Sequence, residues 1–351
     1  MSSDIIAVRP DEALDEERLF AWLQKQDLAG VTERPHITQF GGGKANLTYL
    51  LTFPDVSYVL RRPPFGPIAK GAHDMAREFK VLSRLYKAFP QAPRAFVFCD
   101  VLEVLGAEFF IMEYRQGVVV RMEIPECYAE ITDAPQRMSQ ALVDALADFH
   151  NVTPSSVGLD TLGKPEGFLS RQIHGWFKRW NACTTAADSR MDSLFQWLCE
   201  HEPKSQRMTL VHNDFKLDNV MLSPSDPSQL TSVFDWDMCT IGDPLSDLGT
   251  LLTYWRHEAD DPKYARLAMI PADSRFPSRQ YLIRQYAERT GLNVEQVNFY
   301  HILGLYRLAV ILEQIFARYH HGHTQDERFA EFGELSRLAL DWATEIMRME
   351  S

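Results

Sequence analysis

One stretch of the sequence brings together the residue types that phosphoryl transfer needs. It runs from Val211 to Asn219 as VHNDFKLDN and contains the pattern H-x-D-x-x-x-x-N, formed by His212, Asp214 and Asn219. In loops of this kind the aspartate accepts the proton of a substrate hydroxyl and the asparagine coordinates magnesium. We therefore predict Asp214 as a catalytic base and Asn219 as a magnesium ligand, in a loop spanning residues 211–222.

Two further residues fit the same chemistry. Asp235 follows a short apolar run, 21 residues after Asp214, and we predict it as the second oxygen ligand of the magnesium ion. Lys216 lies two residues after Asp214, so its ammonium can reach a γ-phosphate and neutralise the charge that develops there. The apolar runs 220–222 and 233–234 predict a hairpin, and the metal-binding segment spans 233–248.

Each residue also has a simpler interpretation. A lone HxD is common, and a surface aspartate is usually only solvated, but the full pattern with a second aspartate downstream is much harder to obtain by chance. We interpret His212 as structural, with its side chain hydrogen-bonded to the loop backbone. We interpret Asp218 as a solvated loop acid.

The elements that must position these residues fall into two groups. Short β-rich runs separated by turn residues predict antiparallel strands, and an amphipathic pattern predicts helices. The predicted strands are 37–40, 46–53, 57–61, 95–101 and 108–114, with helices at 14–27 and 72–88. The later predicted helices are 134–151, 171–187, 191–201, 278–289, 297–319 and 326–349. The sequence thus predicts a small sheet with one helix after its third strand, followed by a helical half that contains one non-helical segment, 209–247.

Composition narrows the functional classes. The 351 residues carry a formal net charge of -12, which disfavours nucleic acid and anionic membrane surfaces as partners. The five cysteines are scattered without a CxxC pair, which favours a reducing compartment. The N-terminal residues are acidic where a signal peptide would be basic, and the apolar stretch 301–319 is interrupted by Arg307 and Glu313, which indicates a buried helix. We expect a cytoplasmic protein.

Several motifs together resemble a known family. The strings HNDFKLDN, FDWD and IGDPLSDL resemble the aminoglycoside phosphotransferase-like kinases. The strings GGGKANLTYLL, YVLRRPP, AHDMAREFKVL, FFIMEY and GFLSRQ resemble the branch whose kinase domains are fused to acyl-CoA dehydrogenases. The resemblance covers about residues 30–320 and implies an α+β, protein-kinase-like bilobal fold with ATP between the lobes. We place the N-terminal lobe at 1–115, with a five-stranded sheet, and the C-terminal lobe at 116–351.

The resemblance also implies roles for residues of the N-terminal lobe. The loop 41–46 lies over the phosphates of ATP, with Gly42, Gly43 and Asn46 as contact residues. Arg61 stands where such kinases carry a phosphate-binding lysine, although its neighbour Arg62 leaves the register open by one residue, and Glu78 matches its ion-pair partner.

Two more roles follow from the same resemblance. Backbone groups near Glu113 and Tyr114 are expected to hydrogen-bond adenine, and Asp247 is expected to support the catalytic loop.

Protein-kinase signatures are missing, because Asn213 replaces the arginine of HRD and Trp236-Asp237 replaces Phe-Gly. A small-molecule kinase is therefore favoured, working with ATP and Mg²⁺ on a hydroxylated metabolite, as a monomer or homodimer. The alternative is a nucleotide-binding pseudokinase or metabolite sensor. The acceptor stays open between an aminoglycoside, a hydroxy acid, a hydroxyacyl-CoA and a choline-like alcohol.

Overall fold

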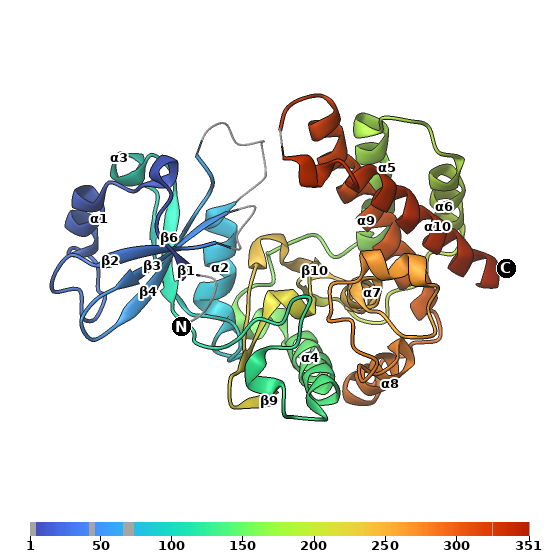
Figure 1. The fold of residues 1–351 in the computed structure, drawn as a ribbon, viewed down its shortest axis with the longest axis horizontal. Helices are drawn as coiled ribbons and strands as arrows, with labels where there is room; N and C mark the ends of the chain where they lie inside the picture. The colour runs from blue at the N-terminus through green and yellow to red at the C-terminus, as the bar shows by residue number, and fades with distance from the viewer. Residues whose placement is uncertain (1–4, 42–45, 66–73, 325, 351) are drawn as a thin grey trace. The chain divides into compact units, whose positions relative to one another are not determined.

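The computed structural model describes residues 5–41, 46–65, 74–324 and 326–350, which pack as two compact units. Unit 1 comprises Met1–Val118 together with Thr231–Cys239, and unit 2 comprises Val119–Leu230 with Thr240–Ser351 (Figure 1). The nine-residue segment Thr231–Cys239 contains Asp235. We expected this segment in the C-terminal lobe, but it packs with the N-terminal sheet and helix.

Unit 1 is built on an antiparallel sheet in the order β1-β2-β3-β4-β6-β5. The strands are β1 (Ile5–Ile6), β2 (His36–Phe40), β3 (Leu47–Thr52), β4 (Ser57–Arg62), β5 (Ala95–Cys99) and β6 (Phe109–Glu113). Five of them match the predicted strands. The sixth, β1, was not predicted, because two residues are too few to show an alternating pattern.

Helices cover both faces of this sheet. Phe109 of β6 packs edge-on against Trp22 of α1 (Glu16–Leu23), with ring centroids 4.9 Å apart. The next residue, Phe110, meets Phe79 of α2 (Met75–Leu85), with centroids 6.2 Å apart. Because successive strand residues point to opposite faces, α1 and α2 lie on opposite sides of the sheet.

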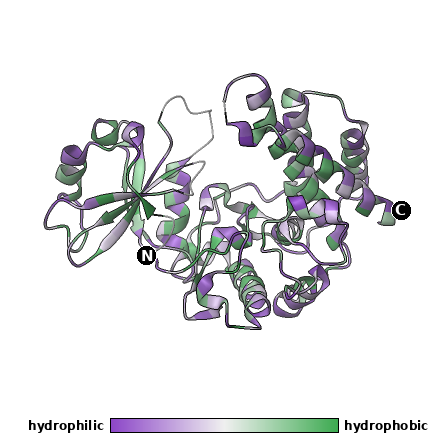
Figure 2. Cartoon of the chain, in the orientation of Figure 1, coloured by the Kyte–Doolittle hydropathy of each residue, from purple (hydrophilic) through white to green (hydrophobic). Residues whose placement is uncertain are grey.

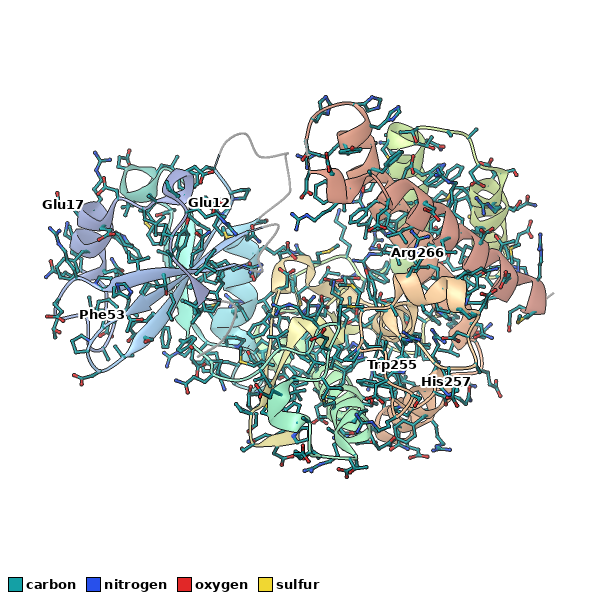
Figure 3. All side chains as sticks on the ribbon, viewed as in Figure 1. Glu12, Glu17, Phe53, Trp255, His257 and Arg266 are labelled. Carbon is teal, nitrogen blue, oxygen red and sulfur yellow. The ribbon has the colours of Figure 1, made fainter. Side chains whose placement is uncertain are left out.

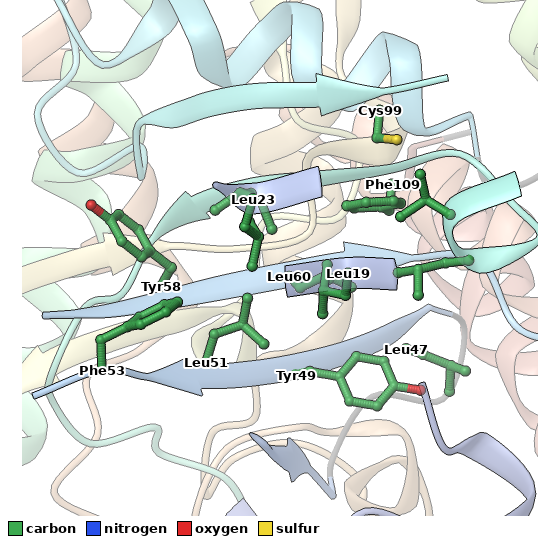
Figure 4. Close-up of a cluster of buried hydrophobic side chains, with 13 residues drawn as sticks. Leu19, Leu23, Leu47, Tyr49, Leu51, Phe53, Tyr58, Leu60, Cys99 and Phe109 are labelled. Carbon is green, nitrogen blue, oxygen red and sulfur yellow. The ribbon is translucent and has the colours of Figure 1, made fainter. Parts of the chain in front are cut away.

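The core on the α1 side is formed by alternate residues of neighbouring strands. Leu60 of β4 pairs with Tyr49 of β3 and with Ile111 of β6, and all three side chains are fully buried. Leu19 and Leu23 of α1 complete the cluster (Figure 4). This packing makes the sheet a rigid support for the residues at the ends of its strands.

Unit 2 is mostly helical. Its helices are α4 (Ala134–His150), α5 (Phe168–Cys183), α6 (Ser189–Glu200), α7 (Leu245–Tyr254), α8 (Arg279–Thr290), α9 (Val297–His320) and α10 (Phe332–Glu350). Its non-helical part holds two small sheets, β7 (Thr209–Val211) with β10 (Thr240–Gly242) and β8 (Val220–Ser223) with β9 (Asp226–Val233). The second is the predicted hairpin, and the boundary between the units falls within β9.

The long helix α9 forms the centre of unit 2, where it packs against α5, α7 and α10. Apolar residues dominate it (Figure 2), and within the described chain it is the one helix long and apolar enough to cross a membrane. Most of its apolar stretch is buried inside the unit, as the sequence predicts for a core helix.

The helix α7 was not predicted, yet it packs closely against α9. A Cβ atom added to Gly249 of α7 would lie 2.1 Å from the Tyr300 carbonyl oxygen of α9. At Gly304 of α9, an added Cβ atom would lie 2.4 Å from Thr253 Oγ1. Trp255 follows α7 directly, and its indole N–H donates to the Pro277 carbonyl at 2.8 Å (Figure 3). These contacts fix the helix that carries Asp247.

Candidate active site

The predicted catalytic loop brings three of its predicted residues together in unit 2. The side-chain amide of Asn219 donates to Asp214 Oδ2 and to the Asp214 carbonyl, both at 2.8 Å. The ammonium of Lys216 lies 3.1 Å from Asp214 Oδ2. A short 3-10 helix, Leu217–Asn219, turns the chain so that Asn219 faces back to Asp214. The loop therefore presents a carboxylate, a cation and an amide within hydrogen-bond reach of one another.

The charge of Lys216 is set by its surroundings. Its ammonium also lies 3.8 Å from Asp218 and 5.0 Å from the ring centroid of Tyr254. Burial alone would lower the pKa of Lys216, but Asp214, Tyr254 and Asp218 outweigh it and raise the pKa above the ordinary lysine range. Asp218 is mostly buried, which raises the pKa of its carboxyl. The expectation that Asp218 is a solvated acid is therefore wrong, because the side chain forms part of the charged cluster.

The start of the loop is held by a buried hydrogen-bond chain. Asp247 accepts from the backbone N–H groups of His212 at 2.6 Å and of Asn213 at 2.7 Å. Its Oδ2 also lies 3.1 Å from His150 Nε2, and His150 Nδ1 lies 2.7 Å from the Tyr286 hydroxyl. Burial lowers the pKa of His150, so the ring is neutral. It then donates from Nε2 to Asp247 and accepts from Tyr286 at Nδ1.

The backbone is strained at two points of the candidate site. Among the described residues, Asn213 and Asp235 are the two non-glycine residues with positive φ, at 66° and 64°. Asparagine and aspartate tolerate this left-handed conformation better than other residues. Such strain persists only where the surroundings enforce it, and it concentrates at functional sites. Here it occurs beside the predicted base and at a predicted metal ligand.

The predicted residues of unit 1 form a second cluster. Arg61 at the end of β4 donates from Nε to Glu78 Oε2 at 2.8 Å and from Nη2 to Asp235 Oδ1 at 2.5 Å. Burial alone would lower the pKa of Arg61, but the charges of Glu78 and Asp235 raise it, so the guanidinium stays charged. Arg62 points to the other face, where it donates to the carbonyls of Pro63 and Leu105. The one-residue ambiguity in the register is thus resolved in favour of Arg61.

Helix α2 fixes the segment that carries Asp235. Arg77 donates from Nε at 3.1 Å and from Nη2 at 2.8 Å to the Cys239 carbonyl, and Val233 N–H donates to the Gln91 carbonyl at 2.9 Å. Trp236 is almost fully buried, and its indole donates to the Val233 carbonyl at 2.8 Å. The DWD sequence therefore uses its tryptophan as an anchor between two acids.

The remaining predicted contacts of unit 1 are only partly visible. Gly42 and Gly43 lie outside the described residues, and Asn46 is buried at the start of β3. In the predicted adenine-binding stretch, Glu113 already donates its backbone N–H to the Arg94 carbonyl at 2.8 Å. The adenine contact predicted for this stretch therefore falls to the backbone N–H groups of Tyr114 or Arg115, which follow β6.

The donor atoms of the two predicted metal ligands suit magnesium. The Asn219 amide nitrogen is engaged by Asp214, so its carbonyl oxygen is directed away from that carboxylate. In Asp235, Arg61 engages Oδ1, and Oδ2 is left to supply a second hard oxygen. The oxygen donors of Asn219 and of Asp235, each taken within its own unit, thus fit the ion.

The fold and the two clusters define a class of protein, the phosphotransferases with a protein-kinase-like fold. The structure aligns with an assigned aminoglycoside phosphotransferase from Ralstonia eutropha at a TM-score of 0.80 and 26% identity, over 96% of this chain and 99% of that one. It also aligns with the aminoglycoside phosphotransferase APH(4)-Ia, in its complex with AMP-PNP and hygromycin B, at a TM-score of 0.60 and 16% identity, over 96% and 99% of the two chains. The second likeness shows the fold alone.

Sequence comparison makes the assignment more specific. A sequence model of the phosphotransferase enzyme family matches residues 36–273, and the chain belongs to that family. The rat acyl-CoA dehydrogenase family member 11 is 32% identical over 335 residues, which cover 93% of this chain but 42% of that protein. The chain thus spans less than half the length of this relative. The resemblance to the branch with dehydrogenase-fused kinase domains is confirmed.

Proposed function

We propose that the protein is an ATP-dependent small-molecule kinase that transfers the γ-phosphoryl group to a substrate hydroxyl. The observation that carries the proposal is the cluster in which Asp214 is contacted by both Asn219 and Lys216. Phosphoryl transfer needs a positioned base and cations at the phosphate oxygens, and little covalent chemistry from the protein. This cluster supplies the base and one cation, and it orients one metal ligand.

Each residue has a distinct task in this proposal. Asp214 accepts the proton of the acceptor hydroxyl. The Lys216 ammonium exchanges its contact with Asp214 for one with the γ-phosphate. Arg61, held by Glu78, binds oxygens of the nucleotide phosphates. Asn219 and Asp235 would hold the magnesium ion, which would supply positive charge to neutralise the phosphates.

The decisive experiment measures ADP release and acceptor phosphorylation with Mg-ATP in wild type, Asp214→Asn and Asp235→Ala. Both substitutions should reduce kcat by at least about 100-fold. Asp226→Asn, at the first residue of β9 and outside the catalytic cluster, is the matched control and should retain activity. Equal turnover by wild type and Asp214→Asn would overturn the proposal.

The same experiment separates a kinase from a nucleotide sensor. A sensor would show magnesium-dependent thermal stabilisation by ATP without turnover of any acceptor. The arginine in place of the usual lysine was a reason to consider this alternative. The ion pair of Arg61 with Glu78 weakens that reason, because it is the pairing expected of the lysine.

The setting of the reaction follows from the composition and the relatives. We propose a cytoplasmic protein that acts on a small hydroxylated metabolite, with no role for nucleic acid or membrane. The chain spans less than half of its dehydrogenase-fused relatives, so we do not attribute dehydrogenase chemistry to it.

A further inference from the structure

A small pocket lies beside the catalytic loop, entirely within unit 2. Helices α5, α7 and α9 form its walls, and Asn213, the residue before Asp214, lies at one side. Its polar wall consists of Gln172, Asn213, Ser246, Thr250 and Arg307. Its apolar wall includes Phe168 and Trp176. The pocket is thus next to the predicted base and large enough only for part of a small molecule.

The charge of this pocket has one sign. Arg307 is the one charged residue among the described residues that line it, and no carboxylate is among them. The Arg307 guanidinium lies 5.4 Å from the ring centroid of Trp176, and a second guanidinium, of Arg179, lies 4.3 Å from the same centroid. Burial lowers the pKa of Arg179, and the nearby charge of Arg307 lowers it further. The two guanidinium groups lie near the same Trp176 ring, so an anion bound beside them would relieve their mutual repulsion.

Tyr254 connects the pocket with the catalytic loop. Its ring centroid lies 5.0 Å from the Lys216 ammonium, and the charges of Lys216, Asp214, Arg307 and Asp218 all act on its pKa. Burial raises the pKa of Tyr254, so its hydroxyl is neutral and keeps its proton. On the loop side of Tyr254 the charge of Lys216 is balanced by Asp214 and Asp218, so the unbalanced positive charge is that of Arg307 on the pocket wall.

We propose that this pocket selects the acceptor by an anionic group, a carboxylate or a phosphate, which binds Arg307. The proposal rests on the proposed kinase function and adds the class of substrate. A guanidinium binds either anion through two parallel hydrogen bonds. An ammonium-rich aminosugar would meet a like charge and find no carboxylate on the described pocket wall, which disfavours it.

The reaction of such an acceptor balances without a further reagent. The acceptor hydroxyl oxygen forms a bond to the γ-phosphorus as the bond from that phosphorus to the β,γ-bridging oxygen of ATP breaks. Asp214 takes the hydroxyl proton, and ADP leaves with the electron pair. The anionic group of the acceptor stays on Arg307 and does not react.

The test compares acceptors that differ only in charge. ADP release is measured with 3-hydroxybutyrate against 3-hydroxybutyramide, glycerol 3-phosphate against glycerol, and hygromycin B as the polycation. The variants are Arg307→Gln and Arg318→Gln, which removes the same charge from an exposed position eleven residues along α9. In parallel, thermal stabilisation by butyrate and by phosphate is measured at constant ionic strength, which needs no turnover.

The expected result is turnover of an acid and not of its neutral partner, with KM for the acid raised roughly 10- to 100-fold in Arg307→Gln. KM for ATP should not change, and Arg318→Gln should behave as wild type. The carboxylate and phosphate arms identify the preferred anion. Thermal stabilisation by an anion that is lost in Arg307→Gln also supports the proposal.

Turnover of hygromycin B or of neutral acceptors with no preference for the acid would overturn the proposal. The absence of any Arg307-dependent anion effect in both assays would also overturn it. The kinase proposal fails separately, if Asp214→Asn retains turnover.

Discussion

The side-chain amide of Asn219 donates to the carboxylate of Asp214 at 2.8 Å. One hydrogen bond thereby orients two functional groups. It holds the predicted base in place and fixes which end of the asparagine amide can approach a cation, because the nitrogen is already committed. The base and the metal ligand of unit 2 are therefore coupled, and a change at one should be measurable at the other.

Substitutions of Asn219 should separate its two contributions. Asn219→Leu removes the metal-binding oxygen and should raise the Mg²⁺ concentration for half-maximal activity at least about tenfold. Asn219→Asp keeps an oxygen but places a second carboxylate against Asp214. Since like charges disfavour ionisation, activity should then require a higher pH. The measurement is the dependence of kcat on magnesium and on pH, and an unchanged magnesium dependence in Asn219→Leu would exclude Asn219 as a ligand.

Even the conservative substitution of Arg61 by lysine should reduce stability and ATP binding. Its guanidinium donates to Glu78 and Asp235 at once, which a single ammonium cannot reproduce. Arg61→Lys should lower the free energy of unfolding by about 1–3 kcal/mol and raise KM for ATP. Arg61→Ala should cost about 3–5 kcal/mol, because the buried Glu78 loses its counter-charge. Urea unfolding measures both, with Arg84→Gln on the exposed side of α2 as a control expected within about 0.5 kcal/mol of wild type.

The chain Tyr286–His150–Asp247 should behave as a unit. Tyr286→Phe removes one hydrogen bond and should cost about 1 kcal/mol, and His150→Phe should cost about 1–3 kcal/mol, because Asp247 loses a buried donor. The double variant should cost less than the sum, since the two side chains share one interaction. Unfolding free energies of the four proteins give the coupling, and strict additivity would contradict the proposed chain.

His301 should make the protein sensitive to acid. Burial lowers the pKa of His301 to about 3, whereas in the unfolded chain it is about 6.5. Between these values the unfolded state binds the additional proton, so stability is full above about pH 6.5 and falls by about 1.4 kcal/mol per pH unit below it. His301→Phe should reduce this slope, as measured by urea unfolding between pH 7 and pH 5. His36→Gln, at an exposed position, should leave the slope unchanged.

Two glycines in helices should respond to alanine with opposite signs. In Gly249→Ala, the added methyl group would collide with the Tyr300 carbonyl and separate α7 from α9, at a cost of about 1–3 kcal/mol or more. Gly175, in α5, has nothing within 4 Å of an added Cβ atom, so Gly175→Ala should stabilise the protein by about 0.4–1 kcal/mol. Thermal melting of both variants is the measurement. Equal changes in melting temperature would show that the close contact between α7 and α9 does not determine the effect of an added methyl group.

Helices and strands were predicted correctly where the hydrophobic periodicity extended over enough residues to identify the element. The strands 36–40, 47–52 and 57–62 and the helix 75–85 follow from alternation and an amphipathic stripe, and α9 follows from its length and apolar content. The sequence could not predict α7, because that helix begins directly after the GDP turn and is buried nearly all round, so it shows no polar face. Spacing alone predicted Asp214, Asn219 and Asp235 as site residues, and the structure brings Asn219 to Asp214 and Asp235 to Arg61.

Long-range partners were beyond the sequence. Nothing around His150 indicates that it meets Asp247, 97 residues away, and Tyr286 is one tyrosine among twelve. The burial of Asp218 could not be foreseen, because a loop acid next to a lysine is usually solvated. The choice between Arg61 and Arg62 depended on strand register, which only the pairing of β4 with β3 and β6 determines.

The position of Thr231–Cys239 in unit 1 has a consequence for how the protein is made. The first 118 residues leave the ribosome early, but the segment that pairs Asp235 with Arg61 follows more than 100 residues later. At ordinary elongation rates this is a delay on the order of ten seconds. During that interval Arg61 and Glu78 have only each other, and Arg77 has no Cys239 carbonyl to bind. The N-terminal part of the nascent chain therefore lacks these contacts during the interval, and the cluster of Arg61, Glu78 and Asp235 is completed only after residue 239 has been synthesised.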